Sequence, residues 1–187
     1  MKNVYRGKEF KLYDELMALQ QDLRRDFFKV HPDYSNSEGI YIYTKDQYPT
    51  PESWKVYPVK YVFDGADQEV KEQQRKLDES VKYKYPTAYE LTQKYGDACP
   101  TACYTVLDPY SGINRHTDIE NPARKYINVH IPLDVPEGDL GLEVDGEVVR
   151  WDDLFAWDNQ KIHSAWNNTD KKRLIFLMDI DRSLCDL

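Results

Sequence analysis

The chain has 187 residues and a formal net charge of -8, with 41% hydrophobic and 31% charged residues. This length and balance are typical of one globular domain that can bury a core, and we expect residues 1–187 to form it. Nucleic acid and anionic membranes both attract basic surfaces, so the acidic composition argues against either as a partner.

The cysteines and the apolar runs indicate the cellular compartment. Cys99, Cys103 and Cys185 follow no metal-ligand spacing, and their odd number favours a reducing environment. The first ten residues are charged and lack the apolar core of a secretion signal, and no apolar run reaches membrane-spanning length. We therefore predict a cytoplasmic protein.

The first half of the chain is expected to be mostly helical. Residues 10–30 carry apolar side chains three or four positions apart, which predicts an amphipathic helix. Residues 67–83 are rich in Glu, Gln and Lys and predict a solvent-facing helix, and Pro86 begins a short helix that Gly96 ends. Prolines divide the aromatic runs between the first two helices into loops and edge strands. Residues 1–99 should therefore form a helical and irregular cover.

From residue 100 the pattern changes to short strands separated by turns. Strands are expected at 102–107, 125–133, 140–144, 147–151, 154–158, 164–167 and 173–180. Asp145-Gly146 is typical of a type I′ hairpin turn. Many short strands at regular spacing predict a sandwich or small barrel over residues 100–183, so the fold class is mainly β with flanking helices.

Three side chains in this half suggest a metal site. His116 and Asp118 lie two residues apart, so on an extended segment they face the same side. His163 follows later, and a rolled sheet can bring distant strands to one mouth. Two imidazoles and one carboxylate on one face of an octahedral metal leave three positions open, as in non-haem Fe(II) oxygenases. Either histidine alone is more simply a surface or hydrogen-bonded residue, so the hypothesis depends on the whole set.

Several longer motifs occur in order over about residues 100–183. They are Tyr-Thr-Val-Leu-x-Pro-x-x-x-Ile-x-x-His ending at His116, Asn-Val-His-Ile-Pro-Leu-x-Val-Pro from Asn128, Gly146 to Trp151, Phe-Ala-Trp-Asp from Phe155, His-Ser-Ala-Trp-Asn from His163, and Arg-Leu-Ile-Phe-Leu-Met-Asp-Ile from Arg173. In these motifs the chain resembles the aspartyl/asparaginyl β-hydroxylase family of Fe(II)/2-oxoglutarate oxygenases. The resemblance implies a double-stranded β-helix (a jelly-roll or cupin-like core) that holds Fe(II), binds 2-oxoglutarate as cosubstrate and uses O2.

The resemblance also assigns roles to single residues. The implied iron ligands are His116, Asp118 and His163. Arg173 would bind the far carboxylate of 2-oxoglutarate, for which a guanidinium offers a charged, bidentate fork. Thr105 takes the position of a cosubstrate-binding hydroxyl, and His130 that of a histidine contacting the same carboxylate. The simpler interpretations are a strand-end arginine, an ordinary β-former and a core histidine.

The chain departs from the family pattern at two points of interest. Some members have glycine where this chain has Asp118, and in related halogenating oxygenases loss of that carboxylate makes room for chloride, so Asp118 favours hydroxylation. Asn128 stands where the family commonly has an arginine that grips the cosubstrate. An amide cannot supply that charge. Asn128 stays among the expected cosubstrate residues, and Arg115 and Arg124 are alternatives that could compensate.

Three further residues near these motifs have structural interpretations. Trp151 and Trp157 are most simply core residues. Asp158 is expected either to orient His163 or to close a turn.

The expected function is an Fe(II)/2-oxoglutarate-dependent dioxygenase that hydroxylates an unactivated C–H bond. The chain has neither a helical repeat nor a membrane span, which favours a small soluble substrate such as a free amino acid or a derivative. The candidate substrate contacts are Arg115, Arg124, Asn114, Tyr104 and Trp166. One alternative is a hydroxylase of a peptide or protein Asp/Asn-type side chain. Another is a catalytically silent metal-binding β-barrel that acts as an interaction module.

Overall fold

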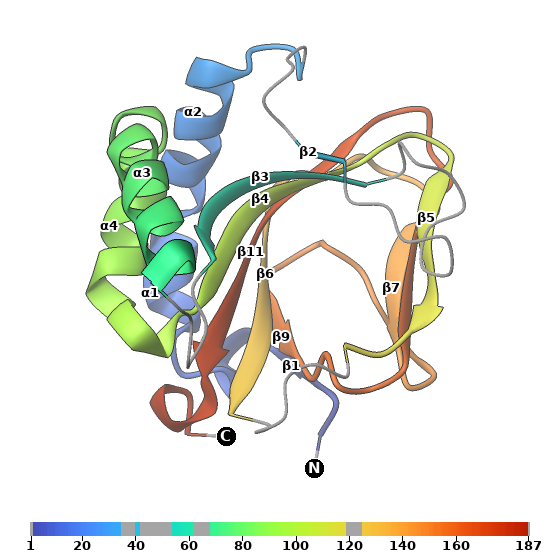
Figure 1. Ribbon diagram of the computed structural model, residues 1–187. Helices are drawn as coiled ribbons and strands as arrows, with labels where there is room; N and C mark the ends of the chain where they lie inside the picture. The colour runs from blue at the N-terminus through green and yellow to red at the C-terminus, as the bar shows by residue number, and fades with distance from the viewer. Residues whose placement is uncertain (1, 35–39, 42–53, 62–67, 119–124, 187) are drawn as a thin grey trace.

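Two antiparallel β-sheets face each other in the computed structural model, which describes residues 2–34, 40–41, 54–61, 68–118 and 125–186 (Figure 1). The larger sheet contains, in spatial order, β1 (Val4–Arg6), β9 (Phe155–Trp157), β6 (Tyr126–Asp134), β11 (Arg173–Asp181), β4 (Thr101–Leu107), β3 (Trp54–Tyr61) and β2 (Ile40–Tyr41). The smaller sheet contains β5 (Ser111–His116), β10 (His163–Asn167), β7 (Leu140–Val144) and β8 (Glu147–Val149). From β4 onward the chain passes back and forth between the sheets, which confirms the expected double-stranded β-helix.

The helices pack together on the outer face of the larger sheet (Figure 1). They are α1 (Tyr13–Ala18), α2 (Gln20–Val30), α3 (Gln68–Lys84) and α4 (Pro86–Tyr95), with 3-10 turns η1 (Gly7–Glu9), η2 (Gly96–Ala98) and η3 (Arg182–Leu184). The helix predicted over 10–30 is two helices, because at Leu19 the N–H bonds the carbonyl of Leu16 in a tighter turn. Within the described residues, no helix is both long and apolar enough to cross a membrane.

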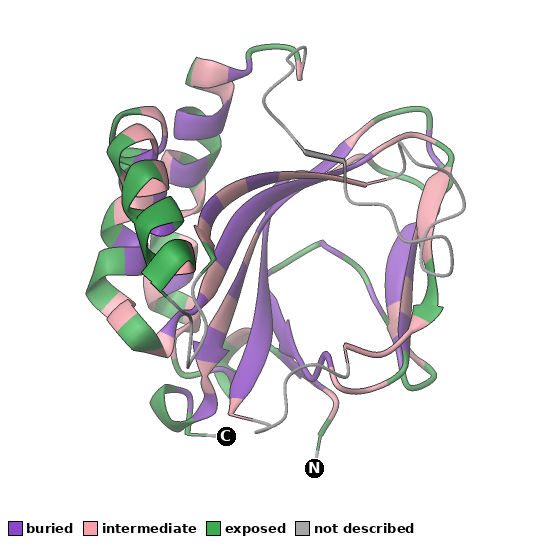
Figure 2. Cartoon of the chain, in the orientation of Figure 1, coloured by how far each residue is buried: buried purple, intermediate pink, exposed green. Residues whose placement is uncertain are grey.

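Each strand in the middle of the larger sheet is covered on both faces, so its residues are buried almost without interruption (Figure 2). Phe176 of β11 belongs to the core beneath the helices, which also contains Leu23 and Phe27 of α2. Its neighbour Ile175 faces the opposite way and packs with Leu142 of the smaller sheet. Successive strand residues point to opposite faces, and here both faces are apolar. The molecule therefore has two cores, one beneath the helices and one between the sheets.

Residues 1–99 contribute strands as well as cover. β1 pairs with β9, and β3 pairs with β4 along its whole length. Pro58 has no N–H to donate, and the register between β3 and β4 shifts between Pro58 and Lys60. Within the described residues, β2 pairs with β3 at Val56 and Lys55.

The β7–β8 hairpin turns at Asp145 and Gly146, whose φ angles are 51° and 86°. Two positive φ angles are the mark of a type I′ turn, as predicted. The hairpin holds β7 beside β10, where Val144 pairs with His163. The turn therefore supports the strand that begins with the second histidine of the expected site.

Candidate active site

The smaller sheet brings His116, Asp118 and His163 together. Their potential ligand atoms all lie within 4.8 Å of one another. β5 pairs with β10 so that His163 is directly opposite His116, with 4.2 Å between the ring centroids. One carboxylate oxygen of Asp118 lies 3.4 Å from Nε2 of His116. Ligand atoms lie about 2 Å from a shared metal, so this cluster is close to the spacing that one ion requires.

A bulge in β5 aims the first histidine inward. His116 pairs with His163 and Ile113 with Ala165, so β5 advances three residues where β10 advances two. In a regular strand, residues three apart would face opposite sides. The extra residue allows both Ile113 and His116 to face the space between the sheets.

Backbone contacts prepare both rings for a metal. Nδ1 of His116 lies 2.7 Å from the carbonyl oxygen of Asn114, and Nδ1 of His163 lies 2.9 Å from that of Lys161. A carbonyl only accepts, so each Nδ1 carries the proton and each Nε2 keeps its lone pair. Burial lowers the pKa of His163, which favours its neutral form. Burial also acts to lower the pKa of His116, but hydrogen bonds from its ring to the Asp118 carboxylate and to the Asn114 carbonyl outweigh burial and raise the pKa.

The larger sheet contributes a buried arginine. Arg173, at the start of β11, is 2% exposed, and its guanidinium lies 4.6 Å above the ring of Trp151. Nη1 reaches the hydroxyl of Thr105 at 3.5 Å. Among the described residues, Nε has no hydrogen-bond partner and the guanidinium has no carboxylate partner. Burial lowers the pKa of Arg173 to about 9, so the group is still cationic at neutral pH.

His130 on β6 lies between two tryptophans. Trp151 Nε1 donates to Nδ1 at 3.0 Å, and Trp157 Nε1 lies 3.3 Å from Nε2. Burial holds the pKa of His130 well below its usual range, so the ring is neutral and can accept at only one nitrogen at a time. Trp157 also packs edge-on against His163, with 4.6 Å between the ring centroids. The two tryptophans, interpreted from sequence as core residues, are thus part of the site.

One cavity of about 120 Å³ unites these groups between the sheets. Its polar lining is His116, Asp118, His163, Arg173, Thr105, Asn128 and His130, and its apolar lining is Trp54, Ile113, Leu142, Trp151, Trp157, Ala165, Ile175 and Leu177. The proposed metal ligands come from the smaller sheet and its β5 end, and the proposed cosubstrate residues come from the larger sheet. The two groups therefore face each other across the cavity.

Two of the expected substrate contacts point away from this cavity. Tyr104 precedes inward-facing Thr105, so it faces the helices, where its hydroxyl donates to the carbonyl of Leu23 at 3.2 Å. Trp166 follows inward-facing Ala165, and its Nε1 donates to Asp139 at 2.7 Å on the outer side of the smaller sheet. The structure removes Tyr104 and Trp166 from the candidate substrate contacts.

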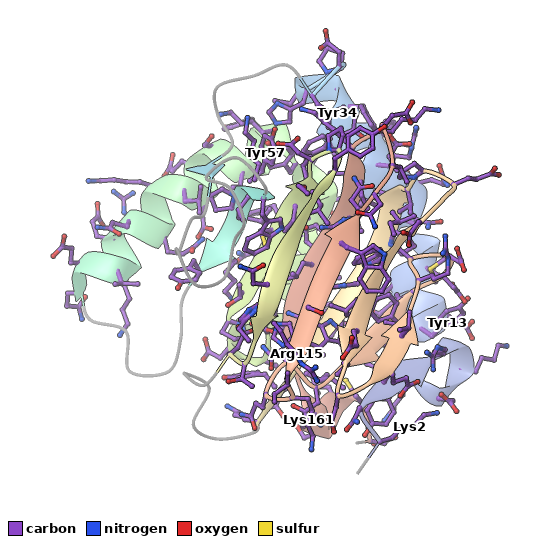
Figure 3. All side chains as sticks on the ribbon, turned by 90° about the vertical axis from the view of Figure 1, so that its right-hand side faces the viewer. Lys2, Tyr13, Tyr34, Tyr57, Arg115 and Lys161 are labelled. Atoms are coloured by element: carbon purple, nitrogen blue, oxygen red, sulfur yellow. The ribbon has the colours of Figure 1, made fainter. Side chains whose placement is uncertain are left out.

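Asn114 and Arg115 are not in the cavity lining either. Asn114 and Arg115 form the β5 bulge and are exposed. Arg115 pairs with Glu143 at 3.4 Å, at the end of the sheets where Figure 3 labels it. Neither residue is placed to compensate for the missing cosubstrate arginine. Arg124 lies outside the described residues.

The structure adds a residue that sequence reasoning missed. Nδ2 of Asn128 donates to the carboxylate of Asp179 on β11 at 3.0 Å. Burial raises the pKa of Asp179 to about 6. Asp179 points to the same face of β11 as Arg173, and it is an acidic residue within an otherwise apolar run. That combination was the available signal for a second inward-facing charged group.

Asp158 closes a turn, which is one of the two roles expected for it. Its carboxylate accepts from the backbone N–H of Gln160 at 3.2 Å and pairs with Arg182 at 3.1 Å. These contacts fix the loop between β9 and β10. The same loop supplies the carbonyl of Asn159 that accepts from the N–H of Asp118 at 3.2 Å.

Two known structures of similar fold are distant likenesses of this chain. A prolyl-4-hydroxylase of Pseudomonas putida is 10% identical, with a TM-score of 0.49 and coverage of 86% of each chain. An oxidoreductase of the 2OG-Fe(II) oxygenase family from Burkholderia pseudomallei is 12% identical, with a TM-score of 0.43 and coverage of 72% of this chain and 71% of that one. At these values the likenesses have no bearing on substrate.

Sequence comparison is more informative about the family. An ornithine lipid ester-linked acyl 2-hydroxylase of Rhizobium tropici is 28% identical over 103 residues, which cover 53% of this chain and 35% of that protein. The chain thus matches about a third of that relative's length. The family model described as aspartyl/asparaginyl beta-hydroxylase matches residues 9–183, nearly the whole chain. The chain therefore belongs to the aspartyl/asparaginyl β-hydroxylase family.

Proposed function

We propose that this protein is an Fe(II)- and 2-oxoglutarate-dependent dioxygenase. It hydroxylates an unactivated C–H bond of a small molecule, with a free amino acid or a derivative as the expected substrate class. The observation that carries the proposal is the buried Arg173, which has no carboxylate partner among the described residues and faces a His–Asp–His cluster across one cavity. A cytoplasmic location remains a prediction from the sequence.

The donor set fits Fe(II). His116 and His163 would bind through Nε2, and Asp118 through a carboxylate oxygen, which is the facial arrangement of non-haem iron oxygenases. When bound, Fe(II) with 2-oxoglutarate and O2 supplies an oxidative decarboxylation that yields succinate and CO2 and places the other oxygen atom in a C–H bond.

The pocket also fits a dicarboxylate. A buried guanidinium without an anionic partner costs several kcal/mol, and an incoming carboxylate offsets that cost through charge-assisted hydrogen bonds. Arg173 would take this carboxylate, helped by the hydroxyl of Thr105. Trp151 covers the guanidinium and donates to His130, so it keeps both side chains in position.

The rest of the lining excludes water. Ile113, Leu142, Ala165, Ile175 and Leu177 present apolar side chains from both sheets. A dry pocket strengthens the interaction of Arg173 with an anion and limits side reactions. The small size of the cavity supports a small substrate or a single side chain.

The direct test is consumption of 2-oxoglutarate. Protein supplied with Fe(II), ascorbate, O2 and 2-oxoglutarate should form succinate, even slowly without a substrate. Mass spectrometry of an amino-acid panel under the same conditions should reveal a product heavier by one oxygen atom. A silent metal-binding module would form no succinate, and that result would refute the proposal.

A further inference from the structure

Asn128 lines the cavity, and the carboxylate of Asp179 lies beside it, behind the residues that form the lining. Asp179 of β11 pairs directly with Asn128 of β6, and the amide nitrogen of Asn128 donates to the carboxylate at 3.0 Å. An ionised carboxylate can only accept, so the NH2 group of Asn128 must face Asp179. This leaves Oδ1 of Asn128, which is buried and has no hydrogen-bond partner among the described residues.

Within the part of the chain that the structure describes, the Asp179 carboxylate is paired only with neutral groups. Its hydrogen-bonding partners are the Asn128 amide and the side chain of Thr101. By contrast, two other carboxylates have a cation as partner: Asp181 pairs with Lys125 at 3.5 Å, and Asp158 pairs with Arg182. Asp179 is partly buried, and burial raises its pKa to about 6, with the nearby carboxylate of Asp118 acting in the same direction.

The position of the pair relative to Arg173 gives the cavity two electrostatic ends. The side chains of Asp179 and Arg173 point to the same face of β11, and Ile175 and Leu177 of the cavity wall lie between them on that face. Six residues of β-strand span about 20 Å. Arg173 supplies a positive charge for the cosubstrate at one end of the cavity. At the other end Asn128 lines the cavity and Asp179 lies behind it, and the negative charge of Asp179 disfavours a carboxylate there.

We propose that the Asp179 carboxylate and the Asn128 carbonyl oxygen bind the protonated amine of the substrate. An ammonium group has three N–H donors and one positive charge, which complement one unpaired acceptor and one uncompensated carboxylate. This inference rests on the proposed function and specifies its substrate class as small molecules with a free cationic amine. Asn128 thereby serves the substrate rather than the cosubstrate.

Binding measured without turnover tests the subsite. Mn(II) accepts the same nitrogen and oxygen ligands. Protein loaded with Mn(II) and 2-oxoglutarate under anaerobic conditions would be titrated calorimetrically with free α-amino acids, and with their N-acetyl derivatives, which keep the carbon skeleton but lose the charge. At least one free amino acid should bind, and its N-acetyl form should bind at least tenfold more weakly. Equal binding of both forms, or no binding of any free amino acid, would overturn the proposal.

Variants assign the effect to these side chains. Asp179→Asn should weaken binding of the same amino acid at least tenfold. Asn128→Arg, which places a guanidinium beside the carboxylate, should also weaken it by occupying the subsite. Glu143→Gln removes one carboxylate from the outer side of β7 and should bind like the wild type. Unchanged affinity in Asp179→Asn or in Asn128→Arg would contradict the subsite.

The two proposals fail in different ways. Absence of succinate from wild-type protein with Fe(II), O2 and 2-oxoglutarate would refute the dioxygenase. The amine titration needs no turnover and can be repeated on metal-free protein. Succinate formation together with indifference to the amine charge would refute only the subsite.

Discussion

His116 and His163 share a local arrangement that suits metal binding. In each case the ring Nδ1 donates to the carbonyl of the residue two positions earlier, at 2.7 Å and 2.9 Å. This contact fixes the tautomer and the orientation of the ring before any metal arrives. The lone pairs that remain at Nε2 meet the Asp118 carboxylate in the same small volume.

Removal of either ring should eliminate the iron site. His116→Ala and His163→Ala each leave two ligands, so both variants should lose iron binding and succinate formation, measured as metal content after desalting and as succinate yield. Arg115→Ala is the matched control, because Arg115 is exposed on the same strand and should retain its iron. Full iron content in either histidine variant would contradict the ligand assignment.

Arg173 should control the requirement for 2-oxoglutarate. Arg173→Ala removes the buried cation that the described residues contribute to the cavity lining. The KM for 2-oxoglutarate should therefore rise at least a hundredfold, in line with about 3–5 kcal/mol for a buried charge contact. Arg173→Lys keeps the charge but loses the bidentate fork and should be intermediate. Lys172→Ala changes the preceding, solvent-facing cation and should leave the KM unchanged. An unaltered KM in Arg173→Ala would count against the role.

Asp179 should reduce stability at neutral pH. Its pKa in the folded state is about 6, above the ordinary value of 3.8, so the folded protein binds this proton more tightly than the unfolded chain does. The free energy of unfolding must then fall as pH rises from about 4 to about 6. Asp179→Asn removes that loss and should be about 1–3 kcal/mol more stable than wild type at pH values above this range. Urea unfolding of the metal-free proteins on both sides of the window measures the difference, and a less stable variant at neutral pH would refute it.

At the scale of elements, β5 and β10 decide whether the two histidines meet. The bulge at Asn114 and Arg115 turns His116 inward, and the pairing of the strands sets His163 opposite it. Gly112 permits this pairing, because a Cβ there would lie 2.6 Å from the backbone carbonyl oxygen of Ala165. Backbone atoms cannot move aside as a flexible side chain can.

Gly112→Ala should therefore push β5 away from β10. We expect a loss of about 1–3 kcal/mol in stability, as for other overpacked sites, and a weaker affinity for Fe(II) or Mn(II) because His116 moves from its partners. Thermal unfolding and a metal titration measure the two effects. Arg115→Ala, on the same strand but exposed, serves as the control. A variant with wild-type metal affinity would show that the β5–β10 spacing does not control the site.

At the scale of the whole molecule, the site joins the two sheets. The metal ligands belong to the smaller sheet and its β5 end, whereas Arg173, Thr105, Asn128 and His130 belong to the larger sheet. A ligand that contacts both groups binds only the folded arrangement. It must therefore stabilise the fold as a whole.

Mn(II) and 2-oxoglutarate should together raise the melting temperature more than Mn(II) alone. At a hundredfold excess over the dissociation constant, a ligand adds about 2.7 kcal/mol of stability. For a chain of this size each kcal/mol corresponds to about 2–4 °C. The increment from 2-oxoglutarate should disappear in Arg173→Ala while that from Mn(II) remains. Equal melting temperatures with and without 2-oxoglutarate would argue against a cosubstrate that spans the sheets.

The sequence by itself determined the local features of this protein. The periodicity and the helix-ending residues located the helices near 68–84 and 86–95, and Asp145-Gly146 specified the hairpin turn. The two-residue spacing of His116 and Asp118 predicted that both side chains face the same side of an extended segment. These features depend on neighbouring residues, so short-range physics is sufficient to predict them.

Only the tertiary structure decided which face of each strand forms the site. The larger sheet is buried on both sides, so apolar patterning did not distinguish the face of Tyr104 from the face of Thr105. The bulge in β5 excluded Asn114 and Arg115, and the register of β6 with β11 paired Asn128 with Asp179. Register and layer order arise from contacts between strands far apart in the chain, and those contacts leave no local pattern to predict them.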